Sequence, residues 1–392
     1  MSSMLEKKIL SQIPKKIIPL KIFDKQVIDF LDNVSYELFK IKDDLKKFPD
    51  LISFAFWCRK NNVIKISKNY TKSGYRLGRG RLLHITPSNV PVNFAFSLAF
   101  GLLSGNYNIV RIPSNNFEQS KYLIRSIKKL LDKKKYKNLR PFIKFIQYKR
   151  DDNLSKKLSS KVEGRVIWGG DQTIEKFKSF KTQPKCIDIS FPDRNSCSII
   201  NLKKVMKLKS GKMNDFIKKF YLDTYTMDQN ACSSPKLVFL ITERNLSKKF
   251  WSKFQNLILE RYKFDLSVSN EKLLNLTKNL ETLSKKNKLS YDQFSLLKIE
   301  IIKNNKLENF NNLNSGFFFE RKIKSIEEIA KYIDEKTQTV TYFGVSKKEI
   351  LKLIQKYGIL GVDRIIPVGQ AFEIGPIWDG HDIILKLSRI IQ

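Results

Sequence analysis

Short apolar runs alternate with longer amphipathic stretches through most of this chain. The short runs are rich in Ile, Val, Leu and Phe and predict strands at Leu82–Ile85, Ile109–Ile112, Phe142–Ile146, Val166–Trp168, Ser198–Ile200, Leu237–Ile241, Ile299–Ile302, Phe317–Phe319, Val340–Phe343 and Ile365–Val368. Apolar residues at helical spacing predict helices at Val92–Ser104, Phe117–Leu131, Ile174–Phe180, Met213–Tyr225, Lys248–Tyr262, Ser325–Glu335 and Lys347–Tyr357. This alternation is typical of α/β folds with parallel sheets. Asn304–Asn314 predicts a polar surface loop.

The size of the chain sets the next limits. Its 392 residues suffice for two domains, and 42% hydrophobic content argues against extensive disorder. The most apolar segment, Val90–Leu103, is interrupted by Asn93 and Ser97 and is shorter than the ~20 residues that cross a bilayer. It therefore predicts a buried helix. No integral membrane segment or signal peptide is expected, and the cysteine usage favours reduced thiols in the cytoplasm.

The formal charge of +36 suggests an anionic partner. However, the basic residues are scattered along the chain, and no recognised nucleic-acid-binding motif accompanies them. We therefore expect no nucleic-acid partner. Attraction of polyanionic small molecules, such as nucleotides and coenzyme A, is the simpler use of this charge.

Cysteine and histidine are sparse. The four cysteines, at positions 58, 186, 197 and 232, lack metal-ligand spacing, and the only histidines are His84 and His381. We expect neither a metal site nor a histidine-based triad. Cys232 differs from the other cysteines because it lies among short polar residues, between a predicted helix and a predicted strand. A thiol in such a setting can ionise and act as a nucleophile, although a small apolar residue capping a buried strand is the alternative.

Three polar loops follow predicted strands: Thr86–Pro91, Arg111–Asn115 and Gly169–Thr173. Open α/β sheets bind their ligands at such loops. Gly169 and Gly170 precede a predicted helix, whose N-terminal N–H groups favour phosphate. Neither a Gly-x-Gly-x-x-Gly fingerprint nor a Walker A sequence is present, so a standard Rossmann or P-loop site is not expected.

In their order along the chain, these segments resemble the aldehyde dehydrogenase superfamily. They are most similar to its acyl-CoA reductase branch, the LuxC-type fatty acid reductases of bacterial bioluminescence operons. The matching stretches are His84–Pro91, Gly101–Asn106, Arg111–Ser114, Trp168–Asp171, Gln229–Pro235, Val362–Gly369 and Gly375–Gly380. The resemblance covers roughly residues 80 to 390.

The resemblance implies an aldehyde dehydrogenase-like fold of two α/β domains with mainly parallel sheets, one nucleotide-binding and one catalytic. Residues 1–228 would hold an N-terminal segment and the nucleotide-binding domain, residues 229–360 would form the catalytic domain, and residues 361–392 would return to close the site. It also implies an acyl-CoA reductase, in which Cys232 takes the acyl group as a thioester and NADPH reduces it to a fatty aldehyde.

Particular residues match the family's site. Asn89 and the backbone N–H of Cys232 would stabilise the oxyanion, although Asn89 fits a turn before Pro91 equally well. The cofactor-binding positions implied by the resemblance are Pro87, Ser88, Arg111, Pro113, Ser114, Gly169 and Gly170. Arg111 stands where the superfamily usually has a lysine on the ribose. Its guanidinium could pair with a 2′-phosphate, which favours NADPH while leaving NADH possible; an ordinary solvated charge is the alternative.

One departure from the superfamily is informative. The Glu-Leu-Gly-Gly-Lys segment, whose Glu activates water in hydrolytic members, has no counterpart in Cys186–Ser196. Its absence supports a reductase, which should exclude water. Asp188 and Asp193 are left open between proton transfer and structural pairing, and His381 between a supporting proton donor and an ordinary helix residue.

Other activities stay open at this stage. The same fold and cysteine could reduce an acyl phosphate or an acyl-carrier thioester, and a non-catalytic basic protein that binds RNA or a membrane surface is the third alternative. We further expect an acyl-CoA or acyl-carrier substrate, an acyl-transferring partner protein and a homo-oligomer. The sequence does not indicate the acyl chain length.

Overall fold

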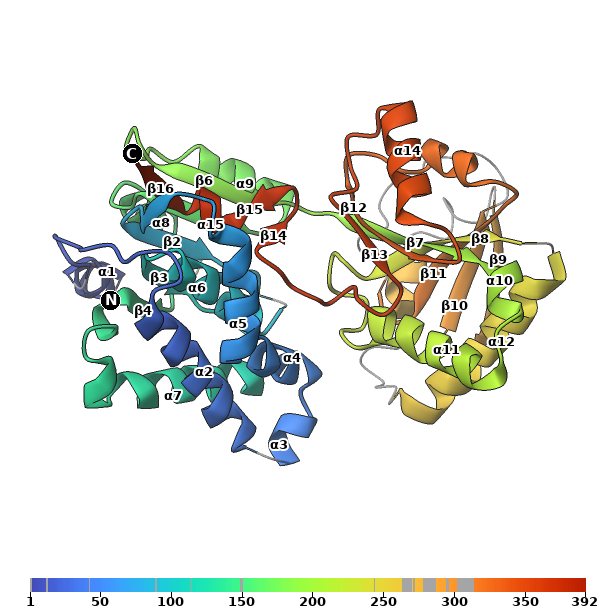
Figure 1. Ribbon diagram of the computed structural model, residues 1–392, viewed down its shortest axis with the longest axis horizontal. Coiled ribbons are helices and arrows are strands. Elements are labelled where there is room, and N and C mark those ends of the chain that lie inside the picture. The colour runs from blue at the N-terminus through green and yellow to red at the C-terminus, as the bar shows by residue number, and fades with distance from the viewer. Residues whose placement is uncertain are drawn as a thin grey trace. The chain divides into compact units, whose positions relative to one another are not determined.

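The computed structural model describes residues 2–11, 13–41, 43–88, 90–113, 115–148, 151–242, 244–262, 270, 272–277, 287–293, 296–301 and 314–392 (Figure 1). The chain divides into two compact units, Met1–Pro192 with Pro376–Gln392, and Asp193–Gly375. Each unit contains a largely parallel sheet with helices packed on it, as the α/β pattern predicts.

The unit boundaries differ from the expected ones at residues 228 and 360. Strand β7 (Asn195–Asn201) pairs with β8 (Pro235–Ile241) and with β12 (Thr337–Phe343), so the second unit begins before β7. Strand β13 (Arg364–Pro367) pairs with β12 and also belongs to that unit. Sheet pairing across long sequence separations therefore sets both boundaries.

The first unit begins with helices α1 (Ser2–Ser11), α2 (Lys25–Phe39), α3 (Asp43–Lys46), α4 (Pro49–Trp57), α5 (Lys60–Ser67) and the 3-10 helix η1 (Lys68–Tyr70). Its central elements are β1 (Tyr75–Gly78), β2 (Arg81–Ile85), α6 (Asn93–Leu103), β3 (Tyr107–Arg111), α7 (Glu118–Leu131), η2 (Lys134–Tyr136), η3 (Arg140–Phe142), β4 (Ile143–Ile146), α8 (Asp152–Ser159), β5 (Gly164–Trp168), α9 (Asp171–Lys178) and β6 (Ile187–Phe191). After the second unit, the chain adds β14 (Ile377–Trp378), β15 (His381–Asp382), α15 (Ile383–Lys386) and β16 (Ser388–Ile391).

The main sheet of the first unit has the order β4-β3-β2-β5-β6, and all its neighbouring pairs are parallel. Counted along the chain from β2, this is the 3-2-1-4-5 order of the nucleotide-binding α/β fold. The order reverses between β2 and β5. Ligands of such sheets bind outside the carboxyl ends of the strands at that point.

Side chains of this sheet alternate between its two faces, as the strand period requires. Leu83 and Ile85 of β2 pack in a core that includes Leu158 of α8 and Phe177 of α9. His84, between them, bonds to Ser97 of α6 on the opposite face. Helices therefore cover both faces of the sheet (Figure 1).

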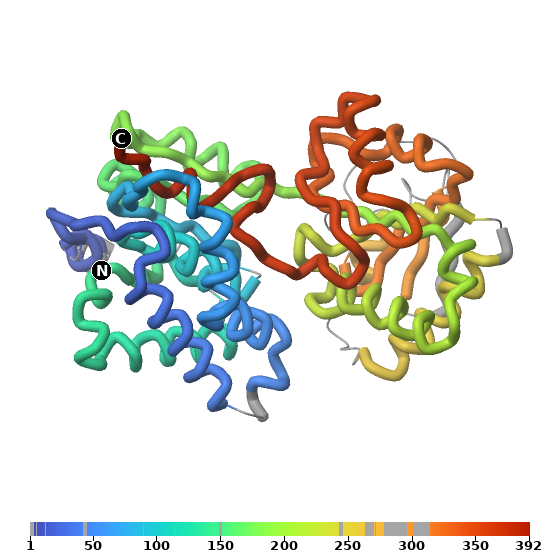
Figure 2. The backbone as a smooth tube through the Cα atoms, viewed as in Figure 1, coloured from blue at the N-terminus to red at the C-terminus, as the bar shows by residue number. Residues whose placement is uncertain are grey.

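The last residues of the chain complete the first unit (Figure 2). Strand β16 pairs antiparallel with β1. The Arg76 side chain on β1 donates hydrogen bonds to Ser388 Oγ at 2.8 Å and to the Leu385 carbonyl at 2.8 Å. The Asn106 side chain donates to the Leu387 carbonyl at 2.9 Å. The first unit is thus built from both ends of the chain.

The second unit contains β7, α10 (Leu202–Met206), α11 (Ser210–Tyr225), β8, α12 (Arg244–Arg261), β9 (Asn287–Gln293), β10 (Leu296–Ile301), β11 (Phe317–Ile323), η5 (Ile326–Lys331), β12, α14 (Lys347–Tyr357) and β13. Its sheet has the order β13-β12-β7-β8-β11-β10-β9, and only the β9–β10 pair is antiparallel among these strands. One face packs on η5 and α14 and the other on α10, α11 and α12.

All ten predicted strands coincide with strands of the structure to within a few residues, although Ile302 lies outside the described residues. Six of the seven predicted helices are α-helices. The seventh, predicted at Ser325–Glu335, is instead the short 3-10 helix η5, begun by a capping box of Ser325 and Glu328. Of the predicted loop at Asn304–Asn314, only Asn314 is described. Among the described residues, no helix combines the length and apolarity needed to span a membrane.

Candidate functional site

Cys232 lies in a turn that joins α11 to the buried strand β8, and we call residues 228–234 the Cys232 turn. The Cys232 side chain is half-buried, and Gln338 Nε2 on β12 donates a hydrogen bond to its sulfur at 3.2 Å. Ser196 Oγ on β7 donates to the Cys232 carbonyl oxygen at 2.6 Å. Two strands thus fix the position of the cysteine, and an amide N–H points at its sulfur.

Gln229 anchors the Cys232 turn from within the core. Its side chain is fully buried, and its Oε1 accepts hydrogen bonds from the backbone N–H groups of Gly316 and Phe317 at 2.8 and 2.9 Å. Its Nε2 donates to the Phe317 carbonyl at 3.1 Å. A single amide side chain therefore ties the turn to the start of β11.

The backbone of the turn is held in an uncommon conformation. Asp228 and Gln229 have positive φ values of 50° and 55°, as do Ser315 and Gly316 in the segment that faces them, at 58° and 84°. The Ser315 N–H donates to the Asp228 carbonyl at 2.8 Å. Non-glycine residues in the left-handed region cost free energy and persist only where surrounding bonds fix them, which is common at functional sites.

A series of hydrogen-bonded polar side chains borders the Cys232 turn. Lys236, at the start of β8, is buried, and its Nζ donates to Asn314 Oδ1 at 2.6 Å. Asn314 Nδ2 in turn donates to Asn230 Oδ1 at 2.9 Å. Burial lowers the pKa of Lys236 to about 8, while electrostatic attraction to Cys232 and to Asp193 acts in the opposite direction.

The other cysteines lie in different surroundings. Cys58 and Cys197 are buried, and burial raises the pKa of Cys197 to about 12 and holds the pKa of Cys58 well above its usual range. Burial, followed by the charge of Asp188, raises the pKa of Cys186 to about 11. These three groups stay protonated thiols near neutral pH, which leaves Cys232 as the candidate nucleophile among the four.

The predicted cofactor loops lie at the carboxyl edge of the first unit's sheet. The loops after β2 and β5 flank the point where the strand order reverses, and they carry Pro87, Ser88, Gly169 and Gly170. Gly170 is the N-cap of α9, and a methyl group on Gly169 would lie 3.2 Å from Thr173 Cγ2. Backbone N–H groups at a helix start, next to a position without a side chain, fit a dinucleotide phosphate.

Arg111 ends the neighbouring strand β3. Its guanidinium lies 4.7 Å from the centre of the Tyr148 ring, and Nη2 is 3.4 Å from the Tyr148 carbonyl oxygen. Thr86 Oγ1 donates to the Arg111 carbonyl at 2.7 Å, which ties the ends of β2 and β3 together. The side chain is therefore held in place at the sheet edge. Pro113 follows and is buried, whereas the predicted site residues Asn89 and Ser114 lie outside the described residues.

His84 is a core residue rather than a reacting one. Its Nδ1 lies 2.7 Å from Ser97 Oγ and its Nε2 lies 2.9 Å from Asn108 Oδ1, with the ring fully buried. Gly101 on α6 makes room for this cluster, since a methyl group there would lie 1.9 Å from Asn108 Oδ1. Burial lowers the pKa of His84 to about 4.

This pKa predicts a pH-dependent stability. Between pH 6.5 and about 4 the unfolded chain binds a proton at His84 that the folded chain does not, so stability present above pH 6.5 is lost as the pH falls through this window. The loss would reach about 3 kcal/mol. Denaturant unfolding of the wild type and of His84→Gln at several pH values tests this. The variant should show the shallower dependence, and equal slopes would mean that folded His84 accepts the proton.

The structure also places the polar residues whose roles the sequence left open. Arg165, buried on β5, donates to both carboxylate oxygens of Asp188, so Asp188 forms a structural ion pair between β5 and β6. His381 lies on strand β15, rather than on a helix, with Nδ1 2.7 Å from Lys386 Nζ. Asp193, the first residue of the second unit, attracts Lys236.

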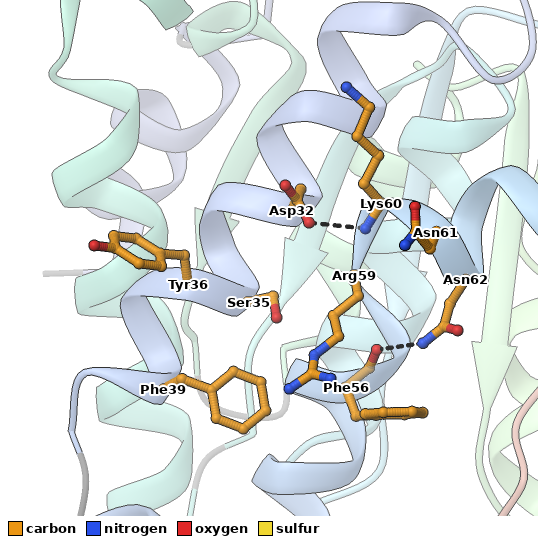
Figure 3. A pocket seen from close by; sticks show the side chains of 9 residues that line it. All are labelled: Asp32, Ser35, Tyr36, Phe39, Phe56, Arg59, Lys60, Asn61 and Asn62. Atoms are coloured by element: carbon orange, nitrogen blue, oxygen red, sulfur yellow. Dashed lines mark hydrogen bonds between the residues drawn. The ribbon is translucent and has the colours of Figure 1, made fainter.

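A concavity of about 760 Å³ lies among the N-terminal helices of the first unit (Figure 3). The Arg59 guanidinium lies 4.8 Å from the ring centres of both Phe39 and Phe56, and Asn62 Nδ2 donates to the Phe56 carbonyl oxygen at 2.7 Å. The residues that line this concavity are Asp32, Ser35, Tyr36, Phe39, Phe56, Arg59, Lys60, Asn61 and Asn62. None of the predicted site residues contributes to it.

Sequence reasoning missed Gln338 and Lys236 as members of the candidate site, and it included Gln229 in a matching stretch without giving it a role. Lys236 carried a usable signal, because a lysine at the second position of a buried strand needs a polar partner. Gln338 carried no such signal in the sequence. It lies near Cys232 because β12 pairs with β7 and β7 pairs with β8. The structure brings these residues around Cys232 in the second unit, while the predicted cofactor residues gather in the first.

Comparisons with known proteins identify related chains. The family "Acyl-CoA reductase (LuxC)" matches residues 62–390. A long-chain acyl-protein thioester reductase of Vibrio harveyi is 24% identical over 337 residues, covering 80% of this chain and 63% of that protein. Its counterpart in Photorhabdus luminescens is 22% identical over 329 residues with the same coverage. The chain thus spans about 63% of the length of these curated relatives.

Solved structures share the fold. The chain matches proline utilization A from Corynebacterium freiburgense with a TM-score of 0.69 and 11% identity, over 99% of this chain and 43% of that one. It matches lactaldehyde dehydrogenase from Escherichia coli with a TM-score of 0.63 and 11% identity, over 93% and 85%. It matches GapN of Methanocaldococcus jannaschii complexed with NADP with a TM-score of 0.61 and 15% identity, over 99% and 91%. The expected aldehyde dehydrogenase-like fold is confirmed, and the family match, which spans most of the chain, shows that it belongs to the acyl-CoA reductase (LuxC) family.

Proposed function

We propose that this protein is an acyl-thioester reductase that forms an acyl-cysteine at Cys232 and releases an aldehyde. The observation that carries the proposal is the half-buried Cys232 sulfur, which receives an amide N–H from Gln338 on a turn held by buried hydrogen bonds. Membership of the acyl-CoA reductase family supports the same chemistry.

In the proposed reaction, the Cys232 thiolate attacks the carbonyl carbon of an acyl thioester and the carrier thiol leaves. Asn89 and the Cys232 backbone N–H are proposed to stabilise the tetrahedral oxyanion, a contribution worth about 10²–10³ in rate per donor. The Gln338 amide would orient the sulfur and stabilise its negative charge through a charge-assisted hydrogen bond. The resulting acyl-cysteine is the species to be reduced.

A nicotinamide cofactor is proposed to bind at the carboxyl edge of the first unit's sheet. Gly169 and Gly170 would approach its phosphates, and Pro87, Ser88, Pro113 and Ser114 would line the site with Arg111. When bound in its reduced form, this cofactor supplies the hydride for the acyl-cysteine. Arg111 favours NADPH because a guanidinium held at a strand end suits a 2′-phosphate. GapN, which shares the fold, was crystallised with NADP.

The proposed acyl donor is an acyl-CoA or an acyl group carried on a protein. The names of the curated relatives specify a long-chain acyl-protein thioester, which supports a protein carrier and an acyl-transferring partner. We also propose a cytoplasmic location and a homo-oligomeric assembly. Reduction of an acyl phosphate is the second candidate, because the same cysteine chemistry would serve it.

Intact mass measurement tests the proposal. The protein is incubated, without cofactor, with acyl-CoAs of graded chain length and separately with an acyl phosphate. We expect an adduct of the acyl mass on the Cys232 peptide, removed on addition of NADPH with release of aldehyde. An adduct from the acyl phosphate alone would favour the second candidate. Absence of any adduct, together with salt-sensitive RNA binding, would favour the non-catalytic alternative.

Cofactor choice gives a separate prediction. Arg111→Ala should raise the KM for NADPH by about ten- to a hundredfold, and that for NADH much less, because a charge-assisted hydrogen bond is worth ~1.5–3 kcal/mol. Turnover at saturating cofactor should change little, since the contact persists from the ground state to the transition state. Steady-state kinetics with both cofactors decide the matter. Equal increases in the two KM values would mean that Arg111 contacts only groups that NADPH and NADH share.

A further inference from the structure

Lys236 is an unusual residue for the beginning of a core strand. Only 7% of its surface is exposed, and the next residues of β8, Leu237 to Leu240, are all buried and apolar. A buried ammonium group costs free energy unless an anion or polar partners compensate it. Asn314 Oδ1, at 2.6 Å, is one such partner, and this side chain is itself held by Asn230 of the Cys232 turn.

The charged groups that act on Lys236 indicate a role for its ammonium group. The charges of Cys232 and Asp193 favour the charged form of Lys236, and Gln338, which donates a hydrogen bond to the Cys232 sulfur, is neutral. A thiolate beside a partly desolvated ammonium is stabilised far more than in water, because the effective dielectric constant is lower. Asp193 offsets part of this field. We propose that Lys236 is a positioning residue whose buried ammonium group stabilises the thiolate form of Cys232.

This inference rests on the proposed role of Cys232 as the nucleophile, and it names the group that activates it. Sequence alone gives the cysteine without a base, and His84 does not supply one, because its ring is buried between Ser97 and Asn108. A fixed positive charge lets the thiol lose its proton to solvent near neutral pH. No proton-accepting partner is then required.

Alkylation by iodoacetamide provides the test, because it needs neither acyl donor nor cofactor. Its rate at the Cys232 peptide is followed by mass spectrometry from pH 6 to 10, since only the thiolate reacts. In Lys236→Met the midpoint should rise by about one pH unit and the rate at pH 7 should fall about tenfold. Lys236→Arg, which keeps the charge, should restore much of the rate.

Lys322→Met is the matched control. Lys322 lies on the adjacent strand β11, aligned with Leu240, four positions beyond Lys236, and its ammonium group pairs with Glu300 and Glu320. The same substitution there removes one charge from the same sheet and should leave the alkylation profile unchanged. An equal shift in both variants would overturn the proposal, as would a wild-type profile in Lys236→Met.

Lys236→Arg keeps the test independent of the fold of Lys236→Met, because it retains the charge at this position. Its alkylation midpoint should stay near that of the wild type and below that of Lys236→Met. A midpoint in Lys236→Arg as high as that in Lys236→Met would contradict the assignment. If the Lys236 effects occur but no acyl donor labels Cys232, the proposed acyl chemistry fails while the thiolate assignment stands.

Discussion

Replacing Cys232 with Ser is expected to abolish acyl labelling and to lower NADPH-dependent reduction by more than about a thousandfold. The serine hydroxyl has no dedicated base, and at neutral pH it is a far weaker nucleophile than a thiolate. The fold should be retained, because the half-buried side chain changes by one atom and Ser196 bonds to the backbone carbonyl. Intact mass with an acyl-CoA and a spectrophotometric NADPH assay measure the two effects.

Cys197→Ala, Cys58→Ala and Cys186→Ala are the controls for this experiment. All three should keep the acyl adduct and the reduction, although loss of the buried Cys58 or Cys197 should cost some stability. Near-normal turnover in Cys232→Ser would mean that the acyl group is never carried on this residue. Loss of labelling in one of the three controls, with the fold intact, would move the nucleophile elsewhere.

Gln229→Leu should destabilise the second unit by about 3 kcal/mol or more. The substitution leaves the buried N–H groups of Gly316 and Phe317 without their acceptor, and each orphaned donor costs about 1–3 kcal/mol. The side chain is fully buried, so water cannot replace the lost bonds without a cavity for it. Denaturant unfolding measures the stability, and the rate of Cys232 alkylation reports whether the turn keeps its geometry.

Gln355→Leu serves as the control for that substitution, because Gln355 is exposed on α14 of the same unit. Its effect should be within about 0.5 kcal/mol, as for most surface changes. Comparable stability losses in the two variants would show that the Gln229 bonds contribute little, and the strained turn would then need another anchor.

Strands and helices could be predicted well from the sequence because their periodicity is local. The buried strand at Leu237–Ile241 and the helix at Val92–Ser104 carry dense apolar patterns, and both exist. Strand β6 was missed because its alternating residues include Asp188, whose charge is neutralised by Arg165 of a neighbouring strand. The edge strand β1 is four residues long and ends in glycine, which gives too little pattern.

The site was predictable only in part, for a related reason. Cys232 and the loops at Pro87, Arg111 and Gly169 stand out by residue type and by their position after strands. Gln338 and Asn314 reach the Cys232 turn through contacts 106 and 84 residues distant in sequence. Such contacts depend on the order of strands in the sheet, which hydrophobic periodicity does not contain.

The pairing of β1 with β16 bears on how the chain emerges from the ribosome. Arg76 and its partner Ser388 are 312 residues apart in sequence. At a synthesis rate of about 5–20 residues per second, Ser388 is added roughly 15 to 60 seconds after Arg76. The second unit, one uninterrupted segment, is complete before this happens. The edge at β1 would be exposed to unwanted pairing during that interval. We therefore expect that slowing synthesis just before residue 388 increases aggregation of the nascent chain, and that an excess of chaperone counteracts it.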